Sequence, residues 1–242
     1  MNAMQKVHPA DVMVTTLSKL LHNEETVFHG VSSHLPMIAI LLAKARHAKD
    51  LVYLNIPGGV NPKSLKLSPY SSASLSQYSP AEAVFPLEEV FDLSMRGGLD
   101  VAFLSGVQFD VQGNVNASVI GPYHQPKVRL PGGAGSAVLI PTAKRALIWR
   151  TKHDVRTFVK QVDFVTTKGN IDRIVTPLCV FKFEDHGLKL EAISPLSSFE
   201  EVQEHTGFDL ERKAYEMLPY PTPEELSMLH RLDPMGLRYK EF

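Results

Sequence analysis

A glycine-rich stretch, RLPGGAGSAVLI at Arg129–Ile140, is where the chain shows its clearest sign of chemistry. Its small and polar residues, which stand ahead of an apolar segment of helical length, are Gly132, Gly133, Ala134, Gly135 and Ser136. Such bare backbone can approach a ligand closely, and successive N–H groups can hold a phosphate or a developing oxyanion. A tight structural turn explains the pattern equally well. The spacings of a dinucleotide fingerprint and of a P-loop are absent.

A second stretch, DLVYLNIPGGVNP at Asp50–Pro62, has the form of an active-site loop without a reactive group. An apolar strand runs into Asn55 and Ile56, followed by Gly58 and Gly59. In an α/β protein, the loop after the carboxyl end of a parallel strand is where ligands usually bind. Neither Asn55 nor Ile56 can act as a carboxylate, thiol or hydroxyl nucleophile.

A third stretch, SGVQFDVQGNVNAS at Ser105–Ser118, gathers polar side chains around a turn. Gln108, Asn114 and Asn116 are of the type that binds a thioester carbonyl or a carboxylate. Turn-forming amides that bond their own backbone are the alternative, and the pattern alone favours it.

The other reactive residue types form no recognisable site. The ten histidines include no H-E-x-x-H or His-x-His pattern, so no metal site is predicted. His29 and His34 flank a turn at the end of a predicted strand. Cys179 lies in an apolar strand, where an inert core residue is expected, and no serine occupies a G-x-S-x-G elbow.

Composition bounds the class of protein. The 242 residues are 44% hydrophobic and 21% charged, with 25 basic against 26 acidic side chains. This balance favours a globular protein with a full-sized core and gives no electrostatic footprint for nucleic acid or an anionic membrane. The longest apolar run, Leu35–Ala43, is too short to span a bilayer, and a single cysteine is compatible with a reducing compartment. We expect a cytoplasmic protein with one domain over residues 1–242.

The order of elements predicts an α/β fold. Helices are expected from Pro9, over Leu35–Lys49, Pro86–Gly98 and Ser197–Leu210, and from Thr222. Strands are expected within the segments Glu25–Ser33, Leu51–Ile56, Leu99–Asp110, Arg145–Thr151 and Val162–Thr167, with a hairpin over Thr176–Ser194 that turns at Asp185–Gly187. Ser64–Pro80 reads as a long functional loop or lid. The β-α-β order predicts an open, mostly parallel sheet with helices on both faces and a small antiparallel hairpin.

The succession of motifs resembles a known family. YLNIPGGVNP, GGLDVAFLSGVQFDVQGNVNAS, GPYHQPKVRLPGGAGSA and VDFVTT occur in the order found in β-type subunits of family I coenzyme A transferases, glutaconate CoA-transferase in particular. The resemblance covers roughly residues 10 to 240, and its most specific parts are the Q-x-D-x-x-G-N-x-N turn and the G-G-A loop. It implies a three-layer α/β/α open sheet, in agreement with the element order.

The resemblance also implies a site. In the transferases, a glutamate of the strand-end loop attacks the acyl-CoA thioester, while backbone amides near the glycine-rich loop stabilise the oxyanion. Ile56 falls where that glutamate is expected, within one residue. We therefore expect Gly132, Gly133 and Ala134 to supply oxyanion-binding amides. The expected substrate contacts are Asn55, Ile56, Gly58, Gly59, Gln108, Asn114, Asn116, Gly135 and Ser136.

Two branches of the family resemble this chain more than the true transferases do: a decarboxylase acting on methylglutaconyl-CoA and a hydrolase that opens a steroid ring as its CoA thioester. Decarboxylation needs an oxyanion hole, a desolvated carboxylate and a proton donor, but no nucleophile, and an apolar Ile56 would deny the carboxylate hydration. The resemblance implies an α-type partner in a heterodimer or an α2β2 assembly, activity that requires this partner, and no cofactor beyond coenzyme A in the substrate. An ordinary transferase subunit and a non-catalytic partner that completes the α-subunit pocket are the alternatives. A sugar-phosphate isomerase of related fold is disfavoured because no acidic and basic set surrounds a phosphate loop.

Overall fold

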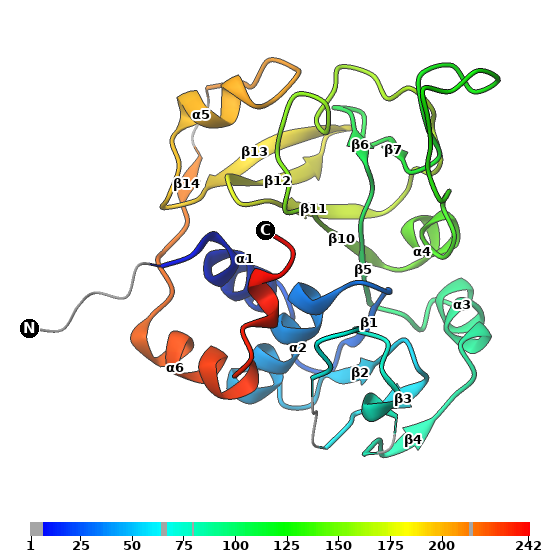
Figure 1. The fold of residues 1–242 in the computed structure, drawn as a ribbon, viewed down its shortest axis with the longest axis vertical. Coiled ribbons are helices and arrows are strands. Elements are labelled where there is room, and N and C mark those ends of the chain that lie inside the picture. The colour runs from blue at the N-terminus through cyan, green and yellow to red at the C-terminus, as the bar shows by residue number, and fades with distance from the viewer. Residues whose placement is uncertain (1–6, 64–66, 79, 213–214) are drawn as a thin grey trace, which may run out of the picture.

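The computed structural model describes residues 7–63, 67–78, 80–212 and 215–242. Within these residues, a ten-stranded sheet has the order β14-β13-β12-β11-β10-β5-β1-β2-β3-β4 (Figure 1). Its strands are β1 (Thr26–His29), β2 (Val52–Leu54), β3 (Gly59–Val60), β4 (Ala83–Val84), β5 (Val101–Leu104), β10 (Arg145–Trp149), β11 (Ile171–Val175), β12 (Cys179–Glu184), β13 (Gly187–Ile193) and β14 (Glu216–Met217). Two small antiparallel ribbons stand apart from it: β6 (Gln108–Phe109) with β7 (Val115–Asn116), and β8 (Val119–Ile120) with β9 (Val128–Arg129).

The helical elements complete the fold. They are α1 (Pro9–Lys19), α2 (His34–Arg46), α3 (Glu88–Met95), α4 (Ser136–Thr142), α5 (Phe199–Glu204) and α6 (Pro223–Leu232), with 3₁₀ turns η1 (Leu75–Gln77) and η2 (Leu237–Tyr239). Their starts follow the sequence signals. Ser198 and Thr222 cap α5 and α6, while His8 and Asp11 form a capping box around the proline that opens α1.

The centre of the sheet is parallel and its flanks are antiparallel. Strands β11, β10, β5, β1 and β2 pair in parallel, whereas β12 and β13 on one side and β3 and β4 on the other pair antiparallel. Parallel strands place all their carboxyl ends at one edge of the sheet. The loops that leave β1, β2, β5 and β10 therefore meet there.

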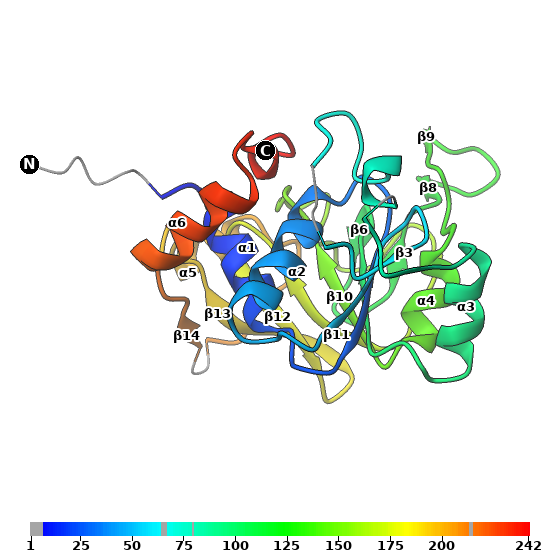
Figure 2. The ribbon, with the colours of Figure 1, turned by 90° about the horizontal axis from the view of Figure 1, so that it is seen from below.

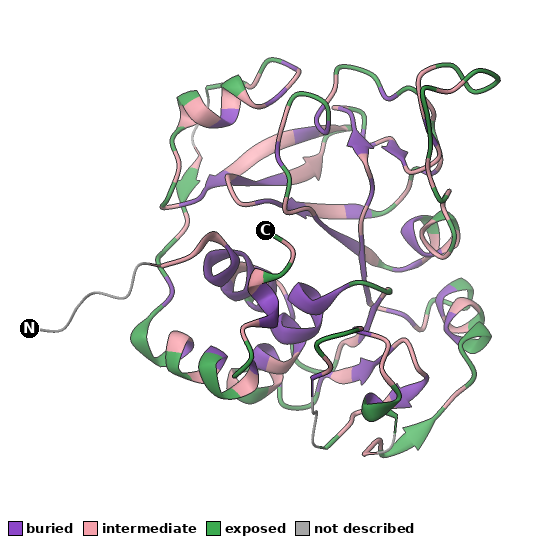
Figure 3. Ribbon diagram, viewed as in Figure 1, coloured by how far each residue is buried: buried purple, intermediate pink, exposed green. Residues whose placement is uncertain are grey.

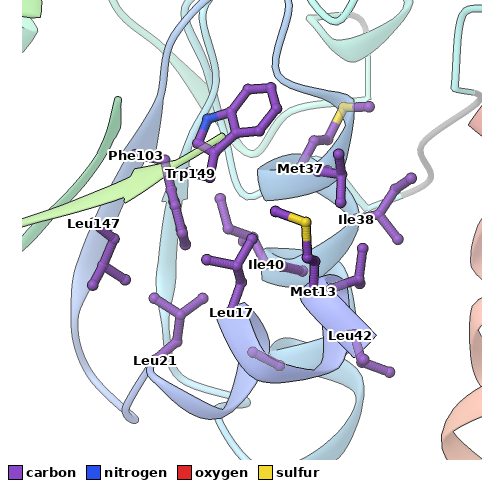
Figure 4. Close-up of a cluster of buried hydrophobic side chains, with 14 of the residues drawn as sticks. Met13, Leu17, Leu21, Met37, Ile38, Ile40, Leu42, Phe103, Leu147 and Trp149 are labelled. Atoms are coloured by element: carbon purple, nitrogen blue, oxygen red, sulfur yellow. The ribbon is translucent and has the colours of Figure 1, made fainter. Parts of the chain in front are cut away.

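Two apolar layers hold the helices on the faces of the sheet. Alternate residues of one strand point to opposite faces, so Val27 joins one core cluster and Phe28 the other. Helices α1, α2 and α6 cover the first face, and α3, α4 and α5 contribute to the second (Figure 2). Figure 4 shows side chains of α1 and α2 meeting Phe103, Leu147 and Trp149 of the sheet. The central strands and α2 are the most continuously buried elements (Figure 3).

Most of the predicted elements are present, with one error in a strand. The predicted α/β class, the parallel β1–β2 pair and the hairpin of β12 and β13 are confirmed. The segment Val162–Thr167 is not a strand: Thr167 makes an isolated bridge to Val115, and the rest is irregular. The sequence pattern does not predict β11, which lies beside β10, where the strand Val162–Thr167 was expected. The described part of Ser64–Pro80 is mostly irregular around η1, and residues 64–66 and 79 lie outside the described chain.

Candidate active site

A cavity of about 570 Å³ opens at the carboxyl ends of the parallel strands. The segments that leave four of these strands line it: Gly30–Ser33 after β1, Ile56 after β2, Ser105 after β5, and Arg150 and Thr151 after β10. The chain passes from β1 to β2 on one side of β1 and later returns to β5 on its other side. Such a change of direction at the carboxyl edge is the preferred ligand site of an open α/β sheet.

The glycine-rich loop supplies another part of the lining. Gly133, Ala134 and Gly135 face the cavity, and their N–H groups donate to no acceptor among the described residues. Gly132 lies outside the lining, and its N–H donates to the Ala117 carbonyl at 2.8 Å. The structure thus leaves three successive amides open to a ligand, but they begin one residue later than the sequence suggested.

The glycine-rich loop is held in a strained and crowded conformation. Ala134 has φ 42° and Ser32, which also lines the cavity, has φ 51°. Left-handed backbone at non-glycine residues costs energy and tends to occur at functional sites. A Cβ atom on Gly133 would lie 2.7 Å from the Cβ of Ala137 and 2.9 Å from a methyl of Thr166. Glycine is therefore required at 133 for the loop to keep this path. Ser136 lines the cavity too, and its hydroxyl donates to the Gly133 carbonyl at 2.6 Å.

The strand-end loop presents Ile56 to the cavity and uses its other residues to build a bend. Asn55 is fully buried: its Oδ1 accepts from the Gly59 N–H at 2.7 Å, and its Nδ2 donates to the Gln77 carbonyl at 3.0 Å. Gly58 has φ 99°, and a Cβ there would lie 2.2 Å from a backbone oxygen. Asn55, Gly58 and Gly59 thus shape the loop, and Ile56 is its member in the lining.

The polar side chains of the Gln108–Asn116 turn bond to one another and to nearby backbone, and they do not line the cavity. Asn116 Nδ2 donates to Gln108 Oε1 at 2.7 Å and to the Val119 carbonyl at 2.6 Å, while Asn114 Nδ2 donates to Asp110 at 3.0 Å. None of the three predicted contacts, Gln108, Asn114 and Asn116, lines the cavity. The structure therefore favours the alternative interpretation, in which these amides satisfy the turn that they form.

Two charged side chains line the cavity in the described part of the chain, Arg150 and Glu241. Burial lowers the pKa of the Arg150 guanidinium, and its Nε is buried without a hydrogen-bond partner among the described residues. Glu241 comes from the end of the chain: its Oε1 accepts from the His34 N–H at 3.1 Å and lies 3.5 Å from His34 Nδ1. The sequence alone selected neither as a site residue, because a basic residue after a strand and an acidic residue near a chain end are common features of protein surfaces.

Two other reactive residues, His29 and Cys179, are buried and have structural roles. Burial lowers the pKa of His29 to about 4 and raises the pKa of its partner Tyr53, whose hydroxyl lies 2.6 Å from His29 Nε2. Burial also raises the pKa of the Cys179 thiol, which confirms it as an inert core residue. Over the described ranges, no group of three or more His, Cys, Asp or Glu side chains is arranged to hold a metal ion. No helix within those ranges is long and apolar enough to cross a bilayer.

Known proteins resemble this chain in sequence and in fold. The model of the coenzyme A transferase family matches residues 11–205. The chain is 31% identical to the B subunit of 3-oxoadipate CoA-transferase from Pseudomonas knackmussii, over 92% of both chains. It is 29% identical to the B subunit of glutaconate CoA-transferase from Acidaminococcus fermentans, over 93% of this chain and 92% of that one. Among solved structures, the decarboxylase AibA/AibB has a chain that superposes with a TM-score of 0.91 at 28% identity, covering 98% of this chain and 99% of its own.

Proposed function

We propose that this chain, which belongs to the coenzyme A transferase family, works with an α-type partner on a small acyl-CoA thioester. The partner is inferred because this chain's relatives are named as B subunits. The chain forms no covalent acyl–enzyme intermediate of its own. The reaction that fits its residues best is decarboxylation of an acyl-CoA whose acyl group comes from a dicarboxylic acid and so keeps one free carboxylate. The partner completes the assembly as a heterodimer or a pair of heterodimers.

The observation that carries this proposal is the presence of Ile56 and the three open amides in one cavity. Gly133, Ala134 and Gly135 offer N–H groups to a thioester oxygen that gains negative charge. The strand-end loop, where the transferases are expected to hold their attacking glutamate, offers the hydrocarbon side chain of Ile56. This combination supports a site that would stabilise an enolate-like oxygen without nucleophilic attack by this chain.

Arg150 supports the choice of a substrate with a second carboxylate. It is the one cation in the described lining, and a guanidinium pairs with a carboxylate through parallel hydrogen bonds. Ile56 follows β2 and Arg150 follows β10, with β1 and β5 between them, so the two side chains mark opposite ends of the cavity. The carboxylate would occupy the end at Arg150, and the thioester oxygen would accept from the amides of Gly133, Ala134 and Gly135.

The walls between these ends are apolar, which favours loss of CO₂. Phe28, Phe91, Leu104 and Leu139 are among the lining residues. Pairing with Arg150 would hold the substrate carboxylate beside these apolar walls, from which water would be excluded. A carboxylate deprived of water loses CO₂ more readily, because its charge passes into the conjugated thioester in the transition state.

The proposed reaction is tested by reconstituting the chain with its α-type partner and supplying glutaconyl-CoA. We expect CO₂ release and a thioester product lighter by CO₂. The variant Arg150→Met should raise KM for this substrate more than it raises KM for a monocarboxylic thioester, because the guanidinium contacts the second carboxylate. Equal effects on both thioesters would remove the assigned role of Arg150.

Two other functions remain as alternatives with distinct outcomes. An ordinary CoA-transferase would move CoA between carboxylic acids and release no CO₂, and hydroxylamine would trap a modified glutamate. A non-catalytic chain would tolerate substitution of Gly133 without loss of turnover, provided that the assembly stayed intact. The open amides at 133–135 favour decarboxylation over the second alternative, since a merely structural turn would use them internally.

A further inference from the structure

The decarboxylation proposed above needs a proton donor, and the cavity contains a group placed to serve. When CO₂ leaves, an electron pair remains on the substrate and must be protonated on carbon. Glu241 is the one carboxyl group that lines the cavity within the described residues. Its side chain is 18% exposed, and its Oε2 is buried without a hydrogen-bond partner among those residues. A buried carboxyl oxygen of this kind is costly unless it meets a partner, and the cavity beside it is where a substrate would supply one.

The end of the chain is anchored, so the position of Glu241 is defined. Arg238, whose side chain is 1% exposed, donates to Asp11 Oδ1 at 2.7 Å and to Asp233 Oδ2 at 2.8 Å. Lys240 Nζ donates to the Pro69 carbonyl at 2.8 Å. The turn η2 and the residue that follows it are thereby tied to α1, to the end of α6 and to the loop that follows residue 66.

His34 completes a proton-carrying pair with Glu241. The hydrogen bond to Glu241 raises the pKa of His34, although partial burial and Lys240 oppose it. His34 Nε2 lies 3.2 Å from the Ser68 carbonyl, which can only accept, so this nitrogen carries a proton. His34 Nδ1 then faces Glu241 Oε1 at 3.5 Å. The raised pKa keeps a proton on the pair to a higher pH than an isolated imidazole would allow.

The location of this pair suits the chemistry. His34 opens α2 directly after the loop from β1, and β1 lies between β2, which leads to Ile56, and β5. Glu241 is therefore held beside the middle of the row of strand ends, between the strand that leads to Ile56 and the strand that leads to Arg150. The carbon that loses CO₂ lies between the thioester and the carboxylate of a substrate bound in this cavity.

We propose that Glu241 is the proton donor of this cavity, with His34 as the positioning residue that supplies its proton. This inference rests on the proposed decarboxylation. The C–C bond to the carboxyl group breaks, its electron pair passes into the conjugated thioester, and CO₂ leaves. The one proton that the pair shares passes from the His34 imidazolium to the Glu241 carboxylate and from Glu241 to the carbon, and His34 is then recharged from solvent.

The test compares variants of the chain in the reconstituted assembly with glutaconyl-CoA. Glu241→Gln keeps the size and the hydrogen bond from the His34 N–H but cannot release a proton, so kcat should fall by roughly 10²- to 10⁴-fold with KM little changed. Glu241→Asp should recover part of the rate. Glu204→Gln, on an exposed position of α5, is the matched control and should match the parent.

His34→Gln gives a readout that a structural role would not move. Lys240 on the same tail opposes protonation of His34, and Arg150 lines the same cavity. His29, at the end of β1, has a pKa lowered to about 4 and so stays neutral near neutral pH. The rate of the parent should therefore decline on the alkaline side as His34 loses its proton, and His34→Gln should abolish that decline while lowering the plateau.

The two proposals fail in different ways. If the parent assembly releases no CO₂ from glutaconyl-CoA, the proposed decarboxylation is wrong, and the role of Glu241 in it is wrong as well. If the parent releases CO₂ and Glu241→Gln does so within twofold of the same rate, decarboxylation stands and the assignment of Glu241 is overturned. Size-exclusion chromatography shows whether each variant still assembles with the partner. If Glu241→Gln and Glu241→Asp both lose assembly together with kcat, the result counts against a catalytic role for Glu241.

Discussion

Arg238 offers a sharp test of how this chain holds its own end in place. Its side chain is 1% exposed and pairs with two carboxylates, Asp11 and Asp233, which are 5% and 0% exposed. Burial and these two ion pairs act on Arg238 in opposite directions, and the net effect raises its pKa. The variant Arg238→Met keeps most of the side-chain volume but removes the charge.

The expected loss of stability follows from what this variant leaves behind. Removing one partner of a buried ion pair typically costs about 3–5 kcal/mol, because the remaining charge is uncompensated. Here two carboxylates lose their cation, so Arg238→Met should lie in the upper part of that range. For a chain of this size, with a urea m-value of about 2.5 kcal/mol/M, the unfolding midpoint should fall by roughly 1.8 M.

Urea unfolding followed by tryptophan fluorescence measures this shift directly. Trp149, the single tryptophan in the sequence, belongs to the same core cluster as Leu237 of η2. Arg212→Met is the matched control: Arg212 pairs with Glu200 at 2.7 Å, but both side chains are 69% exposed. Its midpoint should not change measurably, since exposed ion pairs contribute little.

A second variant separates charge from packing. Adding Asp11→Asn and Asp233→Asn to Arg238→Met removes the uncompensated charges, and most of the lost stability should return. The backbone N–H groups of Leu237 and Arg238 can still donate to an amide oxygen at 233 as they do to Asp233, at 2.7 and 3.1 Å. If Arg238→Met alone costs less than about 1 kcal/mol, the ion pairs do not anchor this segment as argued.

Three further outcomes follow from the geometry. Burial lowers the pKa of His29 to about 4 and that of His153 to about 3, against 6.5 when unfolded, so both must be neutral in the folded protein. Stability should be complete above pH 6.5, and His29 alone should account for a loss on the order of 3 kcal/mol as the pH drops to 4. His29→Gln should remove that share of the pH dependence of the urea midpoint and leave the share of His153. Gly133→Ala, whose Cβ would meet Ala137 at 2.7 Å, should lower kcat roughly 10²-fold by displacing the open amides. Gly187→Ala in the distant hairpin turn should leave kcat unchanged, and equal rates for the two variants would count against an oxyanion-binding loop. Ile56→Glu should give an acyl adduct on this chain that hydroxylamine cleaves and mass spectrometry detects. An adduct on the parent as well would show that the parent chain also supplies a nucleophile.

The fold was predictable because local and long-range signals agree. The apolar residues of α2 and the short apolar runs of β1 and β2 have the lengths of their elements, and the short crossover between the strands leaves parallel pairing as the outcome. The error at Val162–Thr167 has a physical cause. That segment has β-branched residues but lies outside the main sheet, where its backbone bonds to β7 at one point.

The site was predictable only in part, because sequence patterns report backbone shape better than side-chain direction. The glycines at 133 and 135 and the residue Ile56 do line one cavity. Asn55 and Asn116 are polar residues in the expected loops, yet both turn inward to bond their own backbone. Glu241 lies 207 positions from His34 in the sequence, and no local pattern joins residues so distant.

Product analysis of the reconstituted pair tests the central claim most directly. With glutaconyl-CoA as substrate, mass spectrometry should find a thioester that has lost CO₂, together with free CO₂ in equal amount and no acyl modification of this chain. An intact glutaconate released while CoA is transferred to another acid, with a modified glutamate trapped on this chain, would contradict the account.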